Sequence, residues 1–486
     1  MKQKSVKMNF IMNMILMMSN FIFPLITFPY VSRILLPEGT GRVSFATSLI
    51  SYFVIFAQLG IPTYGIRACA KVRDNREELT RTAQELLIIN IVMSIFAYIV
   101  LAIALVTVPR LQEDKLLYII VSLTIIFSAI GMDWLYRALE QYTYITFVSI
   151  FFKFIALITM FVLVHSKSDY VIYGGITIFA SSASNIFNLI NVNKFINLKL
   201  VGNYNFKRHF KAIGTFFAMA CATTIYTNLD TVMVGFMKTD TDVGYYNAAV
   251  KIKNILVSIV TSLGSVLLPR ASYYVENGMM DEFKRITKKA LSFVFLVATP
   301  MMFYFMLFAK EGIFFLSGEA YSGSILPMQI IMPTLLFIGI TNILGIQILV
   351  PLGKEKVVLY SEIAGAITDV ILNAILIPQF ASAGAAIGTL VAEFVVLLVQ
   401  YYALRNEITG TLKQIHHLRI IIACLLGTLT SLWVKNLGLG SFLTLVISAV
   451  IFFGVYGIFL LMMKEEMIVE IWNMIFGKVK KIIHKG

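Results

Sequence analysis

Charged residues and cysteines are both scarce in this chain of 486 residues. Charged side chains make up only 14% of it, and its three cysteines, Cys69, Cys221 and Cys424, are too scattered for a metal site or a disulfide framework. Apolar residues reach 58%, and the mean hydropathy is +0.83. A soluble globule could not hide so large an apolar surplus. The composition therefore predicts a protein that is embedded in a membrane.

Motifs of nucleotide-driven and metal-dependent chemistry are missing too. The sequence contains no GxxxxGK[ST] phosphate-binding loop, no HExxH motif and no long polar insertion. All five His residues lie in loops, at the ends of apolar stretches or near the C-terminus. We therefore expect no catalytic residues, no bound metal and no cofactor, and neither an ATP-driven pump nor a metalloenzyme.

Long apolar stretches recur from one end of the chain to the other. Each has roughly 20 residues or more, which is enough to cross about 30 Å of hydrocarbon as a helix. We therefore expect an all-α polytopic membrane protein with about fourteen transmembrane helices. Their approximate ranges are 8–32, 43–66, 83–108, 116–136, 143–165, 171–193, 212–237, 244–269, 290–309, 325–350, 358–378, 384–404, 417–437 and 441–463.

The distribution of Lys and Arg predicts how these helices are oriented. Basic residues accumulate on the cytoplasmic side of membrane proteins. When the chain is threaded with its N-terminus inside, most of its 40 Lys and Arg residues fall in inner segments. This asymmetry predicts a multi-pass protein of the inner cell membrane with both termini cytoplasmic. The net charge of +14 then faces anionic lipid, and no nucleic-acid partner is needed to explain it.

The two halves of the chain resemble each other weakly. Sliding the sequence along itself superposes Gly41 on Gly244, Ala46 on Ala249, Val54 on Val257, Arg67 on Arg270 and Ala68 on Ala271. The matches predict parallel repeats that could rock against each other across a central cavity. We therefore expect two six-helix lobes, 1–201 and 202–405, two appended helices in 406–463, and an amphipathic cytoplasmic tail in 464–486.

Charged residues within the apolar stretches are candidates for function, because each costs about 2.5 to 3.5 kcal/mol to insert. The basic candidates are Arg33, Lys153, Lys251 and Lys253, and the acidic ones are Asp230, Asp369 and Glu393. An ion pair between Asp230 and a lysine would be a structural explanation. Coupling to a proton or sodium ion is the functional hypothesis for the acids, and packing within a lobe is its alternative.

Two polar patterns fall at helical spacing. In the stretch 171–193, Ser181, Ser184, Asn185 and Asn188 recur at steps of three and four, which suits either hydrogen bonds between helices or contact with sugar hydroxyls. In GMDWLYRALEQYTYIT, a helix would place Asp133, Arg137 and Glu140 on one face near the cytoplasmic side. This second set predicts a scaffold or an inner gate, with direct cargo contact as the alternative.

Several stretches of the sequence resemble one known family. They are FPYVSRILLPEGTG at 28–41, MDWLYRALEQYTYIT at 132–146, and NLDTVMVGFM followed by VGYYNAAVKI within 228–252. They are similar to the Wzx-like, O-antigen type polysaccharide flippases of the MOP (multidrug/oligosaccharidyl-lipid/polysaccharide) exporter superfamily. The positions carried over by motif are Arg33, Asp133, Trp134, Arg137, Glu140, Asp230 and Tyr246.

The resemblance implies a transporter with two lobes and a cationic cavity. Its cargo would be an undecaprenyl-diphosphate-linked oligosaccharide, moved from the cytoplasmic to the outer leaflet by alternating access with ion or membrane-potential coupling. Arg33, Lys153, Lys251 and Lys253 are then candidates for holding the diphosphate. Partners would be the lipid-linked glycan, H+ or Na+, anionic lipid and polysaccharide polymerase machinery.

Two alternatives stay open at this point. A drug or cation antiporter of the MATE type would require a cavity dominated by acidic groups. An integral membrane polymerase or ligase would require a large outer catalytic loop, and the longest loop expected outside is 310–324.

Overall fold

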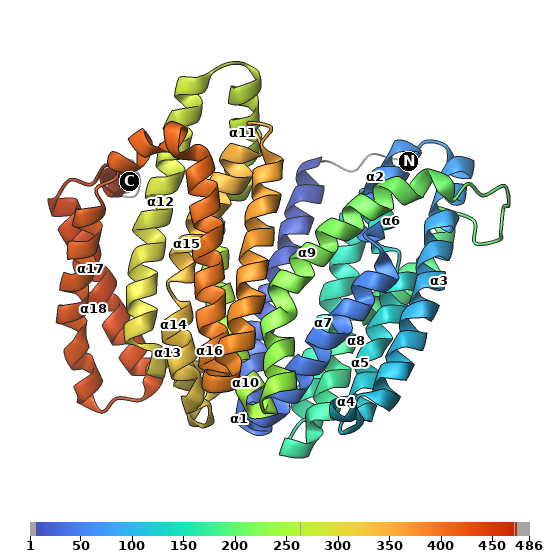
Figure 1. Ribbon diagram of the computed structural model, residues 1–486, viewed down its shortest axis with the longest axis horizontal. Helices are drawn as coiled ribbons and strands as arrows, with labels where there is room; N and C mark the ends of the chain where they lie inside the picture. The colour runs from blue at the N-terminus through green and yellow to red at the C-terminus, as the bar shows by residue number, and fades with distance from the viewer. Residues whose placement is uncertain (1–5, 263, 471, 474–486) are drawn as a thin grey trace, which may run out of the picture. The chain divides into compact units, whose positions relative to one another are not determined.

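The computed structural model describes residues 6–262, 264–470, 472 and 473, and within this part of the chain it contains helices, turns and loops without a β-strand. The all-α prediction is therefore confirmed. The chain divides into two compact units, one ending at Gly244 and the next beginning at Tyr245. Figure 1 shows the helices of the first unit in blue to green and those of the second in green to red.

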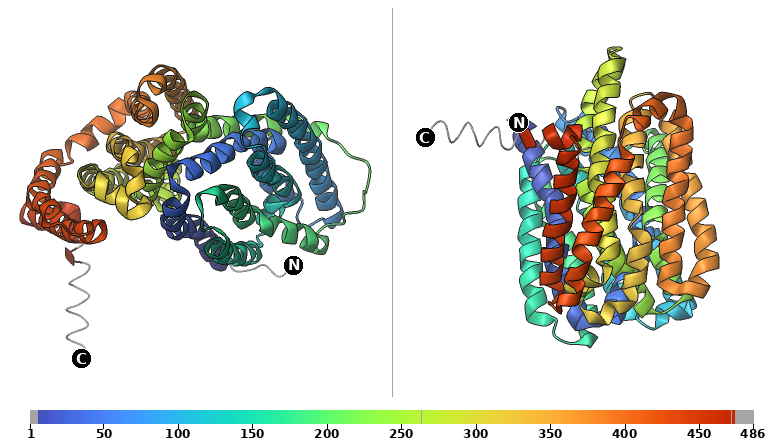
Figure 2. Two further views of the ribbon diagram at one scale, coloured as in Figure 1. Left: turned by 90° about the horizontal axis from the view of Figure 1, so that it is seen from below. Right: turned by 90° about the vertical axis from the view of Figure 1, so that its left-hand side faces the viewer.

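The first unit holds nine α-helices and the start of a tenth. They are α1 (Val6–Gln58), α2 (Ile61–Lys71), α3 (Arg76–Thr107), α4 (Pro109–Gln112), α5 (Lys115–Ile130), α6 (Asp133–Ala138), α7 (Tyr142–Leu163), α8 (Tyr170–Asn191), α9 (Lys207–Met237) and α10 (Asp240–Thr261). Within this unit α8 packs against both α5 and α7, and α1 packs against α3, α5, α7 and α9. Figure 2 shows the same helices from two further directions.

The second unit is built from shorter and longer helices. They are α11 (Gly264–Glu276), α12 (Met280–Leu307), α13 (Ala309–Ser317), α14 (Ile325–Ile331), α15 (Thr334–Asn342), a π-helix (Ile343–Leu349), α16 (Glu355–Lys413), α17 (His417–Ser431) and α18 (Ser441–Met462). Here α12 packs against α15 and α17, and α17 packs against α18.

Two helices are each long enough to contain two of the expected membrane spans. In α1 the helical backbone is interrupted at Leu36, which has φ 59° and precedes Pro37. Proline disfavours helical geometry in the residue before it, which accounts for the site of the interruption. In α16 the interruption is at Ala381, which has φ 48° and follows Pro378. Each interruption falls between two of the ranges expected from the sequence.

The number of membrane spans can be compared with the expected fourteen only in part. By length and composition, nine helices of the described residues could cross a membrane, or ten if the bent pair Glu319–Ile331 and Thr334–Leu349 counts as one span. Two of the nine are the long stretches Ile11–Lys71 and Glu355–Leu412. The chain is thus a multi-pass membrane protein. The count of fourteen and the division into repeat lobes stay predictions.

An ion cluster joins α1, α4, α5 and α10 at one end of the first unit. Arg42 on α1 pairs with Asp114 at 3.0 Å and lies 3.6 Å from Asp240, which also accepts a hydrogen bond from Arg110. Burial raises the pKa of the Asp240 carboxyl, and the guanidinium groups of Arg110 and Arg42 oppose that rise. The cluster fixes the start of α10 to the first unit.

A second cluster fixes the start of α9. Glu85 on α3 is fully buried and accepts hydrogen bonds from Arg208 at 2.7 Å and from the backbone N–H of Asn205 at 2.6 Å. The Nε2 atom of His209 lies 2.6 Å from the same carboxylate, and its Nδ1 atom lies 2.8 Å from the Tyr64 hydroxyl. The neighbouring Gln84 side chain bonds the loop that precedes α9.

The expected amphipathic tail lies largely outside the described residues. Of its described part, Glu466 lies 3.5 Å from Lys288 and Glu470 lies 3.0 Å from Lys289, both on α12. The prediction of a tail in the membrane interface therefore stays a prediction.

We predict that Glu85→Ala lowers the stability of the protein. Removing one partner from a buried ion pair leaves the other buried groups without a partner. The free energy of unfolding then falls by on the order of 3 kcal/mol. The melting temperature of the detergent-solubilised protein, followed by fluorescence-detected size-exclusion chromatography, measures the effect. Glu77→Ala is the matched control, because Glu77 is on the same helix with its side chain 78% exposed. Equal melting temperatures for the two variants would contradict the prediction.

Candidate functional site

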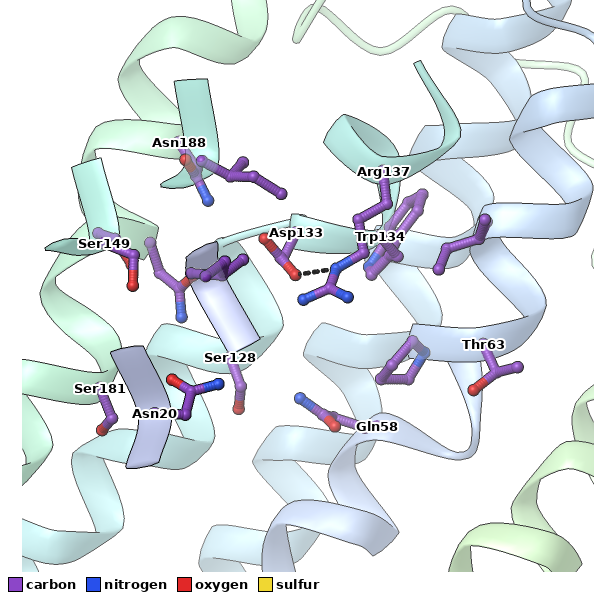
Figure 3. Close-up of a pocket in the computed structure, with 16 residues that line it drawn as sticks. Asn20, Gln58, Thr63, Ser128, Asp133, Trp134, Arg137, Ser149, Ser181 and Asn188 are labelled. Atoms are coloured by element: carbon purple, nitrogen blue, oxygen red, sulfur yellow. Dashed lines mark hydrogen bonds and ion pairs between the residues drawn. The ribbon is translucent and has the colours of Figure 1, made fainter. Parts of the chain in front are cut away.

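The first unit contains a partly open pocket of about 490 Å³. Its walls come from α1, α2, α5, α6, α7 and α8, and Figure 3 shows the residues that line it. The lining residues are Leu16, Asn20, Gln58, Pro62, Thr63, Ile66, Ser128, Asp133, Trp134, Arg137, Ile145, Ser149, Ser181, Ser184, Asn185 and Asn188. Most of them are polar although the surrounding helices are apolar, which marks the pocket as the candidate site.

A break between α5 and α6 shapes one wall of the pocket. The helix α5 ends at Ile130, and Met132 takes the left-handed conformation with φ 45° before α6 begins at Asp133. Gly131 stands at the break because a Cβ there would lie 2.3 Å from the Cγ atom of Asn185 on α8. The glycine therefore allows α8 to approach the break closely enough for its polar residues to face α6.

The short helix α6 supplies the only charged side chains among the lining residues, Asp133 and Arg137. The Nε atom of Arg137 donates a hydrogen bond of 2.6 Å to Asp133, and the two side chains are 34% and 41% exposed. Figure 3 shows this ion pair among the uncharged residues of the pocket. Because each charge is matched by the other, the lining carries no net charge.

Glu140 does not share a helix face with Asp133 and Arg137, so the prediction of one three-residue face is wrong. The helix α6 ends at Ala138, and Glu140 itself has a positive φ of 55°. Glu140 does not line the pocket. Its carboxylate pairs with Arg73 at 3.0 Å and accepts a hydrogen bond from Asn9 at 3.3 Å. Glu140 therefore acts as a structural contact between the N-terminal part of α1, the α2–α3 loop and α6.

The four polar residues predicted on 171–193 all line the pocket from α8. Asn188 is 2% exposed, and its Oδ1 atom has no hydrogen-bond partner within the described residues. Its backbone carbonyl is separately occupied by the Tyr136 hydroxyl. In Figure 3 the amide of Asn188 turns toward the other lining residues. The stripe formed by Ser181, Ser184, Asn185 and Asn188 thus faces the pocket rather than lipid.

Trp134 contributes both apolar surface and a hydrogen-bond donor. Its indole ring packs on α2 at Gly65, where an added Cβ would lie 2.7 Å from the ring. The side chain is 3% exposed, and its Nε1 atom has no partner among the residues that the structure describes. A buried N–H group without a partner costs free energy, on the order of 1 to 3 kcal/mol, that a ligand could recover.

Lys153 lies behind the pocket and does not line it. It is 8% exposed, and its ammonium group donates to the Ser19 hydroxyl at 2.7 Å and to the Asn20 carbonyl oxygen. These bonds explain how the lysine is accommodated inside an apolar bundle. Because the Asn20 oxygen is held by Lys153, the NH₂ end of Asn20 is the part left to face the pocket.

The other predicted charged residues lie elsewhere. Arg33 is exposed on α1 and donates to the Pro29 carbonyl of its own helix. The remaining ones are Asp230, buried on α9, Lys251 and Lys253, partly buried on α10, and Asp369 and Glu393, buried on α16. The pocket is lined by none of these. Their proposed roles in binding and coupling stay predictions.

Five polar lining residues were not found from the sequence: Asn20, Gln58, Thr63, Ser128 and Ser149. Single amides and hydroxyls are common within membrane helices and form no pattern by themselves. They come from α1, α2, α5 and α7, so only the packing of the helices brings them together. Asn20 had an indirect signal, since a lysine at mid-span, Lys153, requires polar neighbours.

Comparison with protein families decides the class of the chain. The model of the family described as polysaccharide biosynthesis protein matches residues 6–275, which is more than half of the chain. The chain belongs to this polysaccharide biosynthesis protein family. A second model, MatE, matches residues 216–375.

Several relatives of the chain carry transport names. The chain is 25% identical to the putative O-antigen transporter of Escherichia coli (strain K12), covering 83% of this chain and 97% of the other. It is also 25% identical to the putative O-antigen transporter of Shigella dysenteriae, with 80% and 97% covered. A probable low-salt glycan biosynthesis flippase, Agl15 of Haloferax volcanii, is 23% identical over 44% of each chain.

The fold is that of a known transporter. The lipid II flippase MurJ in its inward closed conformation superposes with a TM-score of 0.71 at 15% identity, covering 94% of this chain and 100% of the other. The chain therefore has the fold of this flippase, and its named relatives are transporters and flippases. None of these names is that of a polymerase or ligase, the alternative that the sequence leaves open.

We predict that Gly131→Ala lowers the melting temperature of the purified protein. The new Cβ would displace Asn185, and overpacking of this kind costs about 1 to 3 kcal/mol. Gly175→Ala is the control, because a Cβ at Gly175 on α8 would meet its nearest atom at 3.5 Å, an ordinary contact. If the Gly131→Ala and Gly175→Ala proteins have the same melting temperature, the packing of α8 against the break does not require a glycine at position 131.

Proposed function

We propose that this transporter is a flippase for undecaprenyl-diphosphate-linked oligosaccharide repeat units. It moves them from the cytoplasmic to the outer leaflet of the inner membrane by alternating access, with both of its own termini in the cytoplasm. The observation that carries the proposal is the pocket built inside the helices of the first unit, whose lining is polar and carries no net charge. The names of the relatives as O-antigen transporters and glycan flippases support it.

Such a cargo needs a protein because of its headgroup. Moving a diphosphate with several sugars through hydrocarbon requires the removal of its hydration, at a cost of many kcal/mol. Hydroxyl and amide groups such as those of Ser184 and Asn188 can replace water around sugars. The diphosphate requires cations, for which Arg33, Lys153, Lys251 and Lys253 are our candidates.

Arg33 suits the diphosphate best among these cations. It is exposed on α1, whereas the ammonium group of Lys153 is buried and already donates to Ser19 and Asn20. A guanidinium group also offers paired N–H donors that match two phosphate oxygens. Lys153 is better placed to orient Asn20 than to meet the cargo.

The driving force is proposed to be the membrane potential or an ion gradient. Export of negative charge from a negative interior is favourable by about 2.3 kcal/mol per charge per 100 mV. The buried acids Asp230, Asp369 and Glu393 are the candidates for coupling to H+ or Na+. Polysaccharide polymerase machinery would receive the cargo on the far side.

A MATE-like drug or cation antiporter is the second candidate, because the MatE model matches residues 216–375. An antiporter for cationic drugs would need acidic groups in excess at its binding site. In the pocket of the first unit, Asp133 is matched by Arg137. The pocket therefore favours a neutral polar cargo over a cation.

We predict that deleting the gene makes lipid-linked glycan accumulate on the cytoplasmic leaflet. A leaflet-resolved assay, in which a glycosidase or lectin is admitted to one side of sealed membrane vesicles, measures the accumulation. Complementation with the wild-type chain should restore the outer-leaflet pool. Drug hypersensitivity without glycan accumulation would instead identify the antiporter.

We predict that Arg137→Ala reduces transport while the protein still inserts into the membrane. The substitution leaves Asp133 without its partner. If the activation free energy of transport rises by about 1.4 kcal/mol, the transport rate falls tenfold. Transport in the leaflet-resolved assay, normalised to the amount of protein in the membrane, measures it.

Two further variants separate a role in transport from a scaffold role. The double variant Asp133→Asn, Arg137→Gln removes both charges and should retain more transport than Arg137→Ala. Arg285→Ala is the control, because its side chain is 69% exposed in an ion pair on α12 and does not line the pocket. If the Arg137→Ala protein is lost from the membrane but its transport per inserted molecule is unchanged, the ion pair has a structural role only.

A further inference from the structure

The lining of the pocket has the chemistry of a sugar-binding site and lacks that of a phosphate-binding site. Nine of its side chains are uncharged amides or hydroxyls: Asn20, Gln58, Thr63, Ser128, Ser149, Ser181, Ser184, Asn185 and Asn188. Each of these groups can both donate and accept hydrogen bonds, as a sugar hydroxyl does. A diphosphate would require unmatched cations, and the guanidinium group of Arg137 is matched by Asp133.

Two buried polar groups at the pocket have no partner within the described residues. They are the amide oxygen of Asn188 on α8 and the indole N–H of Trp134 on α6. Both side chains are at least nine-tenths buried, and both line the pocket. In a membrane protein an unsatisfied buried group is costly, so a ligand that bonded the Asn188 oxygen or the Trp134 N–H would remove that cost.

The size of the pocket limits how much of the cargo it can hold. A volume of about 490 Å³ lies within the range of roughly 300 to 1,000 Å³ that is usual for small-molecule sites. It has room for one or two sugar rings and is too small for a repeat unit of several sugars. The apolar surface of Trp134, Ile66 and Ile145 offers contact for the C–H faces of a ring.

We propose that this pocket is a subsite for one neutral sugar of the cargo, and that Trp134, Ser184 and Asn188 determine which sugar is accepted. The inference rests on the proposed flippase function and adds the class of ligand and the residues that select it. The diphosphate binds elsewhere. A site built to hydrogen-bond a particular hydroxyl rejects analogues that lack it, because its own buried groups are then left unpaired.

Binding can be measured through Trp134 itself. The chain has three tryptophans, and the other two, Trp433 and Trp472, are 52% and 46% exposed. The double variant Trp433→Phe, Trp472→Phe leaves Trp134 as the sole emitter in the full-length protein. The probes are the methyl glycosides of glucose, galactose, N-acetylglucosamine and N-acetylgalactosamine, and inorganic pyrophosphate serves as the anionic probe.

We expect at least one glycoside to shift the Trp134 emission and pyrophosphate to leave it unchanged. In this background Asn188→Ala and Ser184→Ala should each raise the Kd for the glycoside by roughly tenfold or more. A tenfold change in Kd corresponds to about 1.4 kcal/mol of binding free energy. Asn188→Ala should fold, because the Tyr136 hydroxyl bonds the backbone carbonyl and not the side chain. Thr177→Ala is the matched control on α8, since Thr177 does not line the pocket and bonds the Gly174 carbonyl of its own helix.

A second measurement tests selection during transport. In the leaflet-resolved assay, wild-type and Asn188→Ala proteins are given the native repeat unit and repeat units in which one sugar is replaced by its epimer. We expect the variant to lose rate with the native unit and to discriminate less between native and altered units. Asn193→Ala, at an exposed position of the 3-10 helix Val192–Lys194 that follows α8, should retain the wild-type ratio.

The outcomes separate this inference from the proposed function. If the wild-type protein transports lipid-linked glycan, but no glycoside shifts Trp134 and Asn188→Ala keeps the native selectivity, the subsite is wrong and the flippase stands. A shift caused by pyrophosphate alone would place the diphosphate in the pocket and also overturn the subsite. If glycosides bind but no lipid-linked glycan is transported, the flippase is wrong and the sugar site stands.

Discussion

Inside a membrane, every polar group must find its partner within the protein or in an enclosed space that water or a ligand can enter. At Lys153 and Arg137 the first unit satisfies this constraint by local pairing. Lys153 is bonded to Ser19 and Asn20, and Arg137 is bonded to Asp133. These charges are therefore compatible with an apolar bundle, and they do not create a strongly charged interior. The lining of the pocket is polar and carries no net charge, which is why the pocket suits a hydroxyl-rich ligand.

The pocket in turn depends on the break between α5 and α6. A left-handed residue other than glycine, such as Met132, costs about 1 to 3 kcal/mol, and it persists only when the surrounding structure compensates for it. Here the compensation is the packing of α6 against α2 and of Asn185 against Gly131. An uninterrupted helix would continue in the direction of α5 and would not place α6 across from the polar stripe of α8. The backbone strain at Met132 is thus located where the candidate site is formed.

Composition and helical spacing were sufficient to predict the fold class and part of the site. The apolar stretches predict helices, and Pro37 explains the interruption at Leu36. The spacing of serines and asparagines in 171–193 predicted a polar face that does line the pocket. The sequence places Glu140 wrongly on the helix face of Asp133 and Arg137. Its left-handed backbone could not be predicted, because no glycine or proline there indicates a break in the helix. Gln58 and Ser128 were missed because helix packing alone, and no local pattern, brings them to the pocket.

A neutral sugar subsite has a consequence for how such a cargo could be both held and released. The cationic candidates do not line the pocket, so a diphosphate bound by Arg33 and a sugar bound beside Asn188 would be two separate attachments of one molecule. Two weak attachments on a tethered ligand give a strong combined affinity, because the second binds at a high effective concentration. Loss of either attachment reduces the affinity to that of the other alone. A helix movement that disturbs only one of the two sites would then be enough to release the cargo, without breaking every contact at once.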